Sequence, residues 1–159
     1  MAAPSPQLSV VMPAYDEEAT LAAIVAQVMA LPVELELIIV NDGSRDGTAA
    51  IADTLAAGDP RITVMHQANA GKGAAVQKGI AAATGELVVI QDADLEYDPH
   101  DLVKLLAAME RLGTDVIYGS RRLNYRSSSV EWKFYWGGVL VSWATNLLYG
   151  SHLTDEPTC

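Results

Sequence analysis

Acidic side chains follow one apolar stretch at every second position. Leu87-Val88-Val89-Ile90 has the character of a buried strand, and Asp92, Asp94, Glu96 and Asp98 come directly after it. Like charges this close repel one another, so a cation nearby would offset the repulsion. In an extended chain, residues two apart point to the same side. Carboxylates and a diphosphate together supply the oxygen ligands that Mg²⁺ takes, so the pattern favours a metal–diphosphate site.

Other roles compete for these acids. A calcium-binding EF-hand loop is excluded in its usual form, because Tyr97 stands at the position of the required glycine and Val103 at that of the closing glutamate. Asp98 immediately precedes Pro99, which predicts a helix cap there. For the first two acids the alternative is a pair of solvated turn residues, but solubility explains poorly why they directly follow an apolar strand.

Apolar runs alternate with helical segments along the chain. The predicted strands cover residues 8–12, 35–40, 61–66, 86–91 and 115–119. The predicted helices cover residues 16–30, 46 or 48 to 57, the segment from 74 to 83, and 99–112. Pro13 is expected to stop the first strand, and the acids at 16–18 to form the first turn of a helix. Apolar strands alternating with helices predict an α/β fold, a three-layer sandwich with a mostly parallel central sheet.

The polar clusters of the sequence fall where strands are predicted to end, at residues 14–17, 41–44, 91–94 and 120–122. In such sheets, ligands bind beyond the carboxyl ends of the strands. Asp42 is either an Asx-turn with Gly43 or an acceptor for a nucleobase N–H. Arg121 is either a phosphate clamp or a surface arginine. Gly71-Lys72-Gly73 lacks the spacing of a P-loop, and a glycine turn before a helix explains it as well.

Composition narrows the class of protein. The chain has 159 residues, 50% hydrophobic and 19% charged, which suits one globular domain. A net charge of −10 argues against a nucleic-acid partner. Cys159 is the only cysteine, which excludes an intrachain disulfide and fits a reducing compartment. We expect no signal peptide, because the N-terminus lacks its basic and apolar regions, and no stretch has the ~20 apolar residues of a membrane span.

The last part of the chain differs from the rest. Residues 123–130 are polar and serine-rich, and residues 131–149 are helical in pattern and carry all three tryptophans. This segment is either a core helix or an interfacial helix, since Trp and Tyr favour membrane–water boundaries. We therefore divide the single predicted domain into residues 1–122, which would bind the ligand, and an incomplete part at 123–159.

The motifs together resemble a known family. "SVVMPAYDEEATL", "ELIIVNDGSRDGT", "NAGKGAAVQKGIAAATGELVVIQDADLEYDP" and "DVIYGSRR" occur in this order. They resemble family 2 glycosyltransferases of GT-A fold, and more closely the branch of dolichyl- or polyprenyl-phosphate mannosyltransferases, over roughly residues 8–159.

The resemblance assigns roles to individual positions. It implies nucleotide binding by Pro13, Tyr15, Glu17, Val40 and Asp42, with Asp42 facing the base.

Asp92-Ala93-Asp94 matches the family's DXD motif, whose acids would hold Mg²⁺ or Mn²⁺ and touch the donor. Glu96 falls where the mannosyltransferases commonly carry a glutamine as a further metal ligand. Arg121 matches an arginine that contacts the donor phosphates. The resemblance thus implies a catalytic set of Asp92, Asp94 and Arg121.

The implied reaction is inverting transfer of a sugar from a nucleotide-sugar, GDP-mannose or a UDP-hexose, to a polyprenyl phosphate at the cytoplasmic face of the membrane. A lipid phosphate is already a nucleophile at neutral pH and needs no strong base. A sugar hydroxyl would need a carboxylate base, in the region of Asp155-Glu156 or beyond Cys159.

Other readings of the chain stay open. One is transfer to a polysaccharide or glycolipid hydroxyl, and another is a non-catalytic module that binds nucleotide-sugars. A nucleotidyltransferase would normally need a glycine- and arginine-rich loop near the N-terminus, and residues 13–20 are neither. The family's chains continue beyond the position of Cys159, so we expect a fragment or a natural truncation that folds but turns over poorly.

Overall fold

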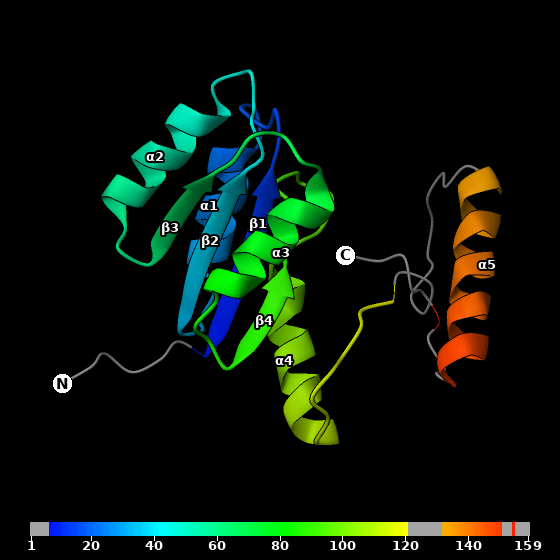
Figure 1. Ribbon diagram of the computed structural model, residues 1–159. Helices are drawn as coiled ribbons and strands as arrows, with labels where there is room; N and C mark the ends of the chain where they lie inside the picture. Colours follow the sequence, from blue (N-terminus) through cyan, green and yellow to red (C-terminus); the bar gives the residue numbers. More distant parts are fainter. Residues whose placement is uncertain (1–6, 121–131, 151–153, 155–159) are drawn as a thin grey trace. The chain divides into compact units, whose positions relative to one another are not determined.

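The structure is a computed structural model that describes residues 7–120, 132–150 and 154 (Figure 1). The chain forms two compact units, Met1–Val103 and Lys104–Cys159, and the sheet lies in the first. The division that the sequence suggested near residue 122 was a functional one, and it stays a prediction.

Strands and helices alternate as predicted. The strands are β1 (Leu8–Ala14), β2 (Leu35–Asn41), β3 (Ile62–His66) and β4 (Leu87–Ile90). The helices are α1 (Leu21–Met29), α2 (Thr48–Gly58), α3 (Lys72–Ala82), α4 (His100–Leu112) and α5 (Trp132–Tyr149).

The four strands form a parallel sheet in the order β3-β2-β1-β4. From β1 to β3 the chain moves in one direction across the sheet, and from β3 to β4 it returns past β2 and β1. Right-handed crossovers therefore put α1 and α2 on one face and α3 on the other. Figure 1 shows α3 in front of the strands and α1 behind them. The predicted α/β class with a parallel sheet between helical layers is confirmed.

The core lies around the two central strands. Every residue of β1 is buried, and so is every residue of β2 except Glu36. Helix α1 buries one stripe spaced at i, i+3, i+4 and i+7, made of Leu21, Ile24, Val25 and Val28. Strands covered on both faces need apolar side chains on both, which explains their continuous apolar sequence.

Two predicted boundaries at the start of the chain are wrong. Strand β1 does not stop at Pro13 but continues to Ala14, and Pro13 pairs with Val40. Proline is tolerated there because β4 pairs only with Leu8–Val11, so this end of β1 has a strand on one side only. Helix α1 begins at Leu21 and not at Asp16. Asp16 adopts a positive φ of 55°, which a right-handed helix does not allow.

The predicted fifth strand at residues 115–119 is also wrong. This segment has no strand partner, and Val116 and Tyr118 are 65% and 55% exposed. Its β-branched and aromatic residues favour an extended backbone, but a strand also needs a neighbour to accept its hydrogen bonds.

The helix predictions near the other end are closer. Asp98 Oδ1 accepts the His100 N–H at 2.9 Å, which confirms the predicted cap at the start of α4. Helix α5 matches the predicted aromatic helix, and it exposes the large side chains Trp143, Leu147, Leu148 and Tyr149. Among the described residues, no helix combines the length and the apolar character needed to cross a membrane.

The packing of α3 on the sheet requires a glycine at position 79. A Cβ there would overlap Val11 Cγ1 and would lie 3.3 Å from Val40 Cγ2. We expect Gly79→Ala to lower the free energy of unfolding by ~1–3 kcal/mol, because β1 or α3 must shift. Gly73→Ala is the matched control on the same helix, since a Cβ at Gly73 meets nothing within 4 Å. Urea denaturation of both variants checks this, and equal stability of the two would contradict it.

The amino ends of the strands are tied by one carboxylate. Glu36 Oε1 accepts hydrogen bonds from Ser9 Oγ at 2.5 Å, from the Thr84 N–H at 2.6 Å and from Thr84 Oγ1 at 3.0 Å. Ser9 Oγ in turn accepts the Gly85 N–H at 2.8 Å. Burial raises the pKa of Glu36, but these hydrogen bonds outweigh it and lower the pKa below its usual value of 4.5.

The lowered pKa makes this tie depend on pH. Its stabilisation is fully present above the pKa of the unfolded chain and is lost as pH falls through the lower, folded value. We expect Glu36→Gln to lower the free energy of unfolding at pH 7 by about 1 kcal/mol. The difference from the wild type should shrink below pH 4.5, the usual value. Urea titrations at several pH values measure it, and a difference that does not change with pH would refute the assignment.

Candidate functional site

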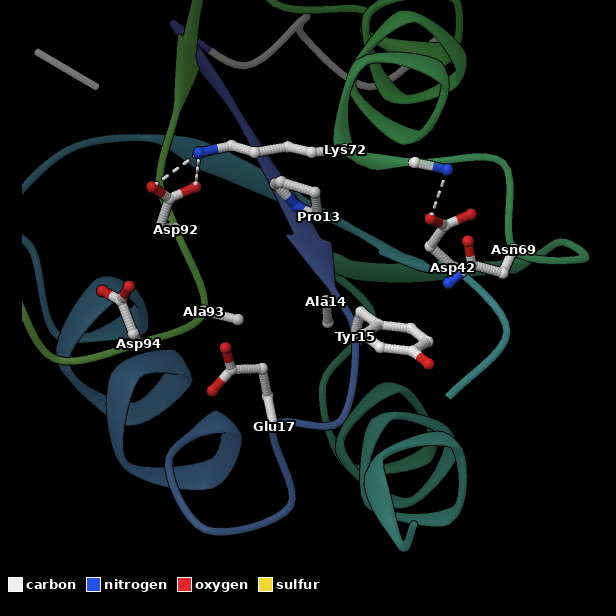
Figure 2. Close-up of a pocket in the computed structure, with 11 residues that line it drawn as sticks. Pro13, Ala14, Tyr15, Glu17, Asp42, Asn69, Lys72, Asp92, Ala93 and Asp94 are labelled. Atoms are coloured by element: carbon white, nitrogen blue, oxygen red, sulfur yellow. Dashed lines mark hydrogen bonds and ion pairs between the residues drawn. The ribbon is translucent and has the colours of Figure 1, made fainter. Parts of the chain in front are cut away.

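A pocket of about 320 Å³ opens at the carboxyl ends of the strands (Figure 2). Its walls come from the segments after β1, β2 and β4 and from the loop before α3. The lining residues are Pro13, Ala14, Tyr15, Glu17, Asp42, Asn69, Gly71, Lys72, Asp92, Ala93 and Asp94. Figure 2 shows Asp42 and Asn69 on one side, Asp92, Ala93 and Asp94 on the other, and the end of β1 between them.

Most of the predicted site residues meet in this pocket. Pro13, Tyr15, Glu17, Asp42, Asp92, Ala93 and Asp94 all line it. Val40 does not, because it lies fully buried inside β2. Glu96 is exposed and is not among the lining residues. Arg121 lies outside the described residues. The roles of these last three stay predictions.

Asp42 fixes the loop that closes one side of the pocket. Its Oδ1 accepts hydrogen bonds from Gln67 Nε2 and the Ala70 N–H, and its Oδ2 accepts the Gly71 N–H, each at 2.8 Å. The side chain of Gln67 and the two N–H groups hold the pKa of Asp42 below its usual value, although burial opposes them. A buried carboxylate with these donors stays ionised and adds a negative charge to the pocket wall.

Gly43 lets the turn after β2 approach the same loop. It has a φ of +71°, and a Cβ on it would lie 2.7 Å from the Asn69 backbone nitrogen. The sequence suggested two alternatives for Asp42, a turn or a base acceptor. In the structure its carboxylate bonds across to residues 67–71 while it lines the pocket.

Hydrogen bonds between residues 16–18 and residues 44–48, which we call the loop latch, hold the other wall. The Asp16 N–H donates to Ser44 Oγ at 3.1 Å, and the Arg45 N–H donates to Asp16 Oδ1 at 2.7 Å. The Glu17 N–H donates to Thr48 Oγ1 at 2.7 Å. The remaining two bonds pair Glu18 with Asp46 and Gly47.

The latch explains why α1 does not begin at Asp16. The N–H groups of residues 16–18 and the side chains of Asp16 and Glu18 bond to the loop after β2, and only the Glu17 carbonyl bonds toward α1, by accepting the Leu21 N–H at 3.0 Å. These bonds anchor the segment that carries Tyr15 and Glu17, both of which line the pocket. Glu17 Oε2 also accepts a hydrogen bond from Thr20 Oγ1 at 2.6 Å.

Asp92 and Asp94 form the acidic wall. Both oxygens of Asp92 contact Lys72 Nζ, at 2.7 and 2.8 Å. Asp94 Oδ1 accepts the Glu96 N–H at 3.0 Å, so the chain bends after Asp94 rather than staying extended. This bend explains why Glu96 leaves the series that the alternating spacing suggested.

The pocket carries more negative than positive charge. Among the described lining residues, Glu17, Asp42, Asp92 and Asp94 supply carboxylates, and Lys72 alone supplies an ammonium group. In the described part of the chain, no three His, Cys, Asp or Glu side chains are gathered closely enough to hold a metal ion by themselves. Asp92 and Asp94 supply two carboxylates, and Mg²⁺ commonly binds through one or two carboxylates with phosphate oxygens and water. The donor set therefore fits a cation that arrives with a phosphate ligand.

Four lining residues, Ala14, Asn69, Gly71 and Lys72, were given little or no weight in the sequence. Ala14 and Asn69 have no chemistry of their own that would single them out. Lys72 lay in the Gly71-Lys72-Gly73 segment, whose spacing does not match a P-loop. The signal that could have identified Lys72 is its position directly after a glycine break and at the start of a helix. Such a position can place a lysine ammonium at the carboxyl edge of the sheet.

Comparison with known proteins places the chain. The family model described as glycosyl transferase family 2 matches residues 9–153. An undecaprenyl-phosphate 4-deoxy-4-formamido-L-arabinose transferase from Aeromonas hydrophila is 35% identical over 155 residues, 93% of this chain and 46% of that relative. A polyprenol monophosphomannose synthase from Mycolicibacterium smegmatis is 39% identical over 123 residues, 74% of this chain and 46% of that relative. The chain therefore spans less than half the length of these relatives.

Solved structures agree on the fold. The mannosyltransferase PcManGT from Pyrobaculum calidifontis, solved with GDP-Man and Mn²⁺, is 28% identical with a TM-score of 0.56. The match covers 62% of this chain and 30% of that one. Staphylococcus aureus TarS matches 78% of this chain and 38% of its own, at 23% identity and a TM-score of 0.62. The second likeness concerns the fold alone. With a family model that spans most of its length, a parallel sheet of GT-A type and two relatives above 30% identity, the chain belongs to glycosyltransferase family 2.

Proposed function

We propose that this chain is the donor-binding part of a metal-dependent, inverting glycosyltransferase that moves a sugar from a nucleotide-sugar to a polyprenyl phosphate. One observation carries the proposal. A single pocket has a buried, ionised Asp42 on one side and the Asp92/Asp94 pair on the other, joined by the end of β1. A nucleoside diphosphate is long and has one polar base and one charged end, which suits such an arrangement.

The base would lie toward Asp42 and Tyr15. Each carboxylate oxygen can accept two hydrogen bonds, so Asp42 Oδ2 keeps capacity for a base N–H beside that of Gly71. Tyr15 is 39% exposed in the pocket lining and offers a ring on which a base can stack.

The diphosphate would lie toward Asp92 and Asp94. These two acids would hold Mg²⁺ or Mn²⁺, and the ion would neutralise the charge that develops on the departing nucleoside diphosphate. Their carboxylates also fix the diphosphate end relative to β1, so the anomeric carbon faces the acceptor in one orientation. Glu96 as a further metal ligand and Arg121 as a phosphate contact belong to this proposal.

The acceptor is inferred from the relatives. The names of the Aeromonas and Mycolicibacterium proteins specify undecaprenyl phosphate and polyprenol monophosphate chemistry. A phosphate monoester oxygen attacks without a strong general base, which agrees with a pocket whose acids are engaged in positioning. The exposed aromatic and aliphatic side chains of α5 suit contact with a membrane surface, where such an acceptor resides at the cytoplasmic face.

Transfer to a polysaccharide or glycolipid hydroxyl is the second candidate. One fold can host more than one acceptor class, so family membership does not by itself select the lipid phosphate. A module that binds a nucleotide-sugar without turnover is a third, because the chain spans less than half of its relatives.

Donor binding should depend on metal and on Asp94. We expect calorimetry to show binding of one donor among GDP-mannose, UDP-glucose and UDP-N-acetylglucosamine in the presence of Mn²⁺. Chelator should abolish the binding, and Asp94→Asn should weaken it at least about tenfold, because one anionic metal ligand is lost.

Asp53→Asn is the matched control, because it removes the same charge from a residue that is paired with His66 outside the pocket. It should bind the donor as the wild type does. Donor binding that survives both chelator and Asp94→Asn would refute the metal–diphosphate site.

Acceptor class has a separate test. In the presence of the donor and Mn²⁺, radiolabelled sugar should pass to undecaprenyl phosphate and not to a hydroxyl acceptor such as a glycolipid. Transfer only to the hydroxyl acceptor would favour the second candidate, and donor binding without any transfer would favour the third.

A further inference from the structure

Lys72 and Asp92 form an ion pair across the pocket. Lys72 Nζ reaches both oxygens of Asp92, at 2.7 and 2.8 Å, from the first residue of α3 (Figure 2). The side chain of Asp92 is only 16% exposed, whereas that of Lys72 is 54% exposed, so the lysine end of the pair remains in contact with water.

The backbone before Lys72 is held by hydrogen bonds, so the Cα of this lysine has little freedom to move. Asp42 holds the N–H groups of Ala70 and Gly71, and Gly71 has a φ of +90° that turns the chain into α3. Lys72 follows at once, so its Cα is fixed from the Asp42 side of the pocket. Its side chain then crosses above Pro13 to the Asp92 side, as Figure 2 shows.

A divalent cation on Asp92 must take at least one oxygen that the ammonium now contacts. A second positive charge at this distance is repelled as well, so the lysine and the cation weaken each other's binding to Asp92. Lysine has a flexible stem and a point charge, which allows the ammonium to swing away while the backbone stays in place.

We propose that Lys72 competes with the divalent cation for Asp92 and thereby makes metal binding depend on the nucleotide. The inference rests on the proposed function, because it assumes that Asp92 is a metal ligand. The diphosphate of a donor brings an anion into the same pocket, and this anion can receive the ammonium that leaves Asp92. Metal alone must displace Lys72 from Asp92 with no phosphate to receive it, whereas metal together with a diphosphate supplies that phosphate.

The coupling is reciprocal. If the nucleotide raises metal affinity by some factor, metal raises nucleotide affinity by the same factor. Removing the lysine charge should therefore strengthen the binding of metal alone and weaken the coupling.

The test measures Mn²⁺ binding without turnover, by electron paramagnetic resonance of free Mn²⁺, on the whole chain. We expect Lys72→Met to bind Mn²⁺ about fivefold more tightly than the wild type, because the competing charge is gone. Adding UDP or GDP should raise Mn²⁺ affinity by a smaller factor in this variant than in the wild type. Circular dichroism and thermal unfolding confirm that the variant is folded.

Lys78→Met is the matched control, because it removes the same charge from the same helix. Lys78 Nζ donates to the His66 carbonyl at 2.8 Å and does not line the pocket. It should leave Mn²⁺ affinity unchanged.

Asp94→Asn separates failure of the inference from failure of the proposed function. If Asp94→Asn weakens Mn²⁺ binding but Lys72→Met leaves it equal to or weaker than the wild type, the competition is refuted and the metal site stands. If Mn²⁺ does not bind even in the presence of UDP or GDP, or binds equally with and without Asp94, both the metal site and the competition are refuted.

Discussion

The pocket depends on one buried carboxylate. Asp42 sits at the end of β2, only 3% exposed, and the loss of hydration is offset only because Gln67, Ala70 and Gly71 all donate to it. Those donors belong to the loop that begins α3. The same interaction that keeps the charge buried therefore fixes the loop, the start of the helix and the lysine that follows. Two of its donors are backbone groups, so they are available whatever side chains the loop carries.

The sequence predicts well whatever depends on local pattern. Continuous apolar runs indicate buried parallel strands, and the polar residues at the ends of three of them lie around the pocket. It predicts poorly what depends on a distant partner. Residues 115–119 favour a strand but pair with no neighbour. Asp16 looks like part of a helix but bonds to the turn after β2, 28 and 29 residues away.

The acidic wall also combines a feature that the local pattern predicts with one that it does not. Alternating acids predicted a metal site, and Asp92 and Asp94 do share a pocket. Whether the series extends to Glu96 depends on the backbone after Asp94, and there the Glu96 N–H turns back to Asp94 Oδ1. An Asx-turn of this kind is a property of three residues and their surroundings, and the spacing alone does not reveal it. The spacing likewise does not reveal that Lys72, at the start of α3, contacts Asp92 in the segment after β4.

The loop latch has a consequence for how such a pocket can change. Its bonds run through the side chains of Asp16, Glu18, Ser44, Asp46 and Thr48, none of which lines the pocket, and through backbone groups. Scaffold and recognition surface are thus assigned to different side chains on the same short segments. Substitutions at Tyr15 or Ala14 would change the lining of the pocket while the loops keep their shape. This separation suits a family whose members differ in their sugars, because a substitution that changes specificity need not destabilise the fold.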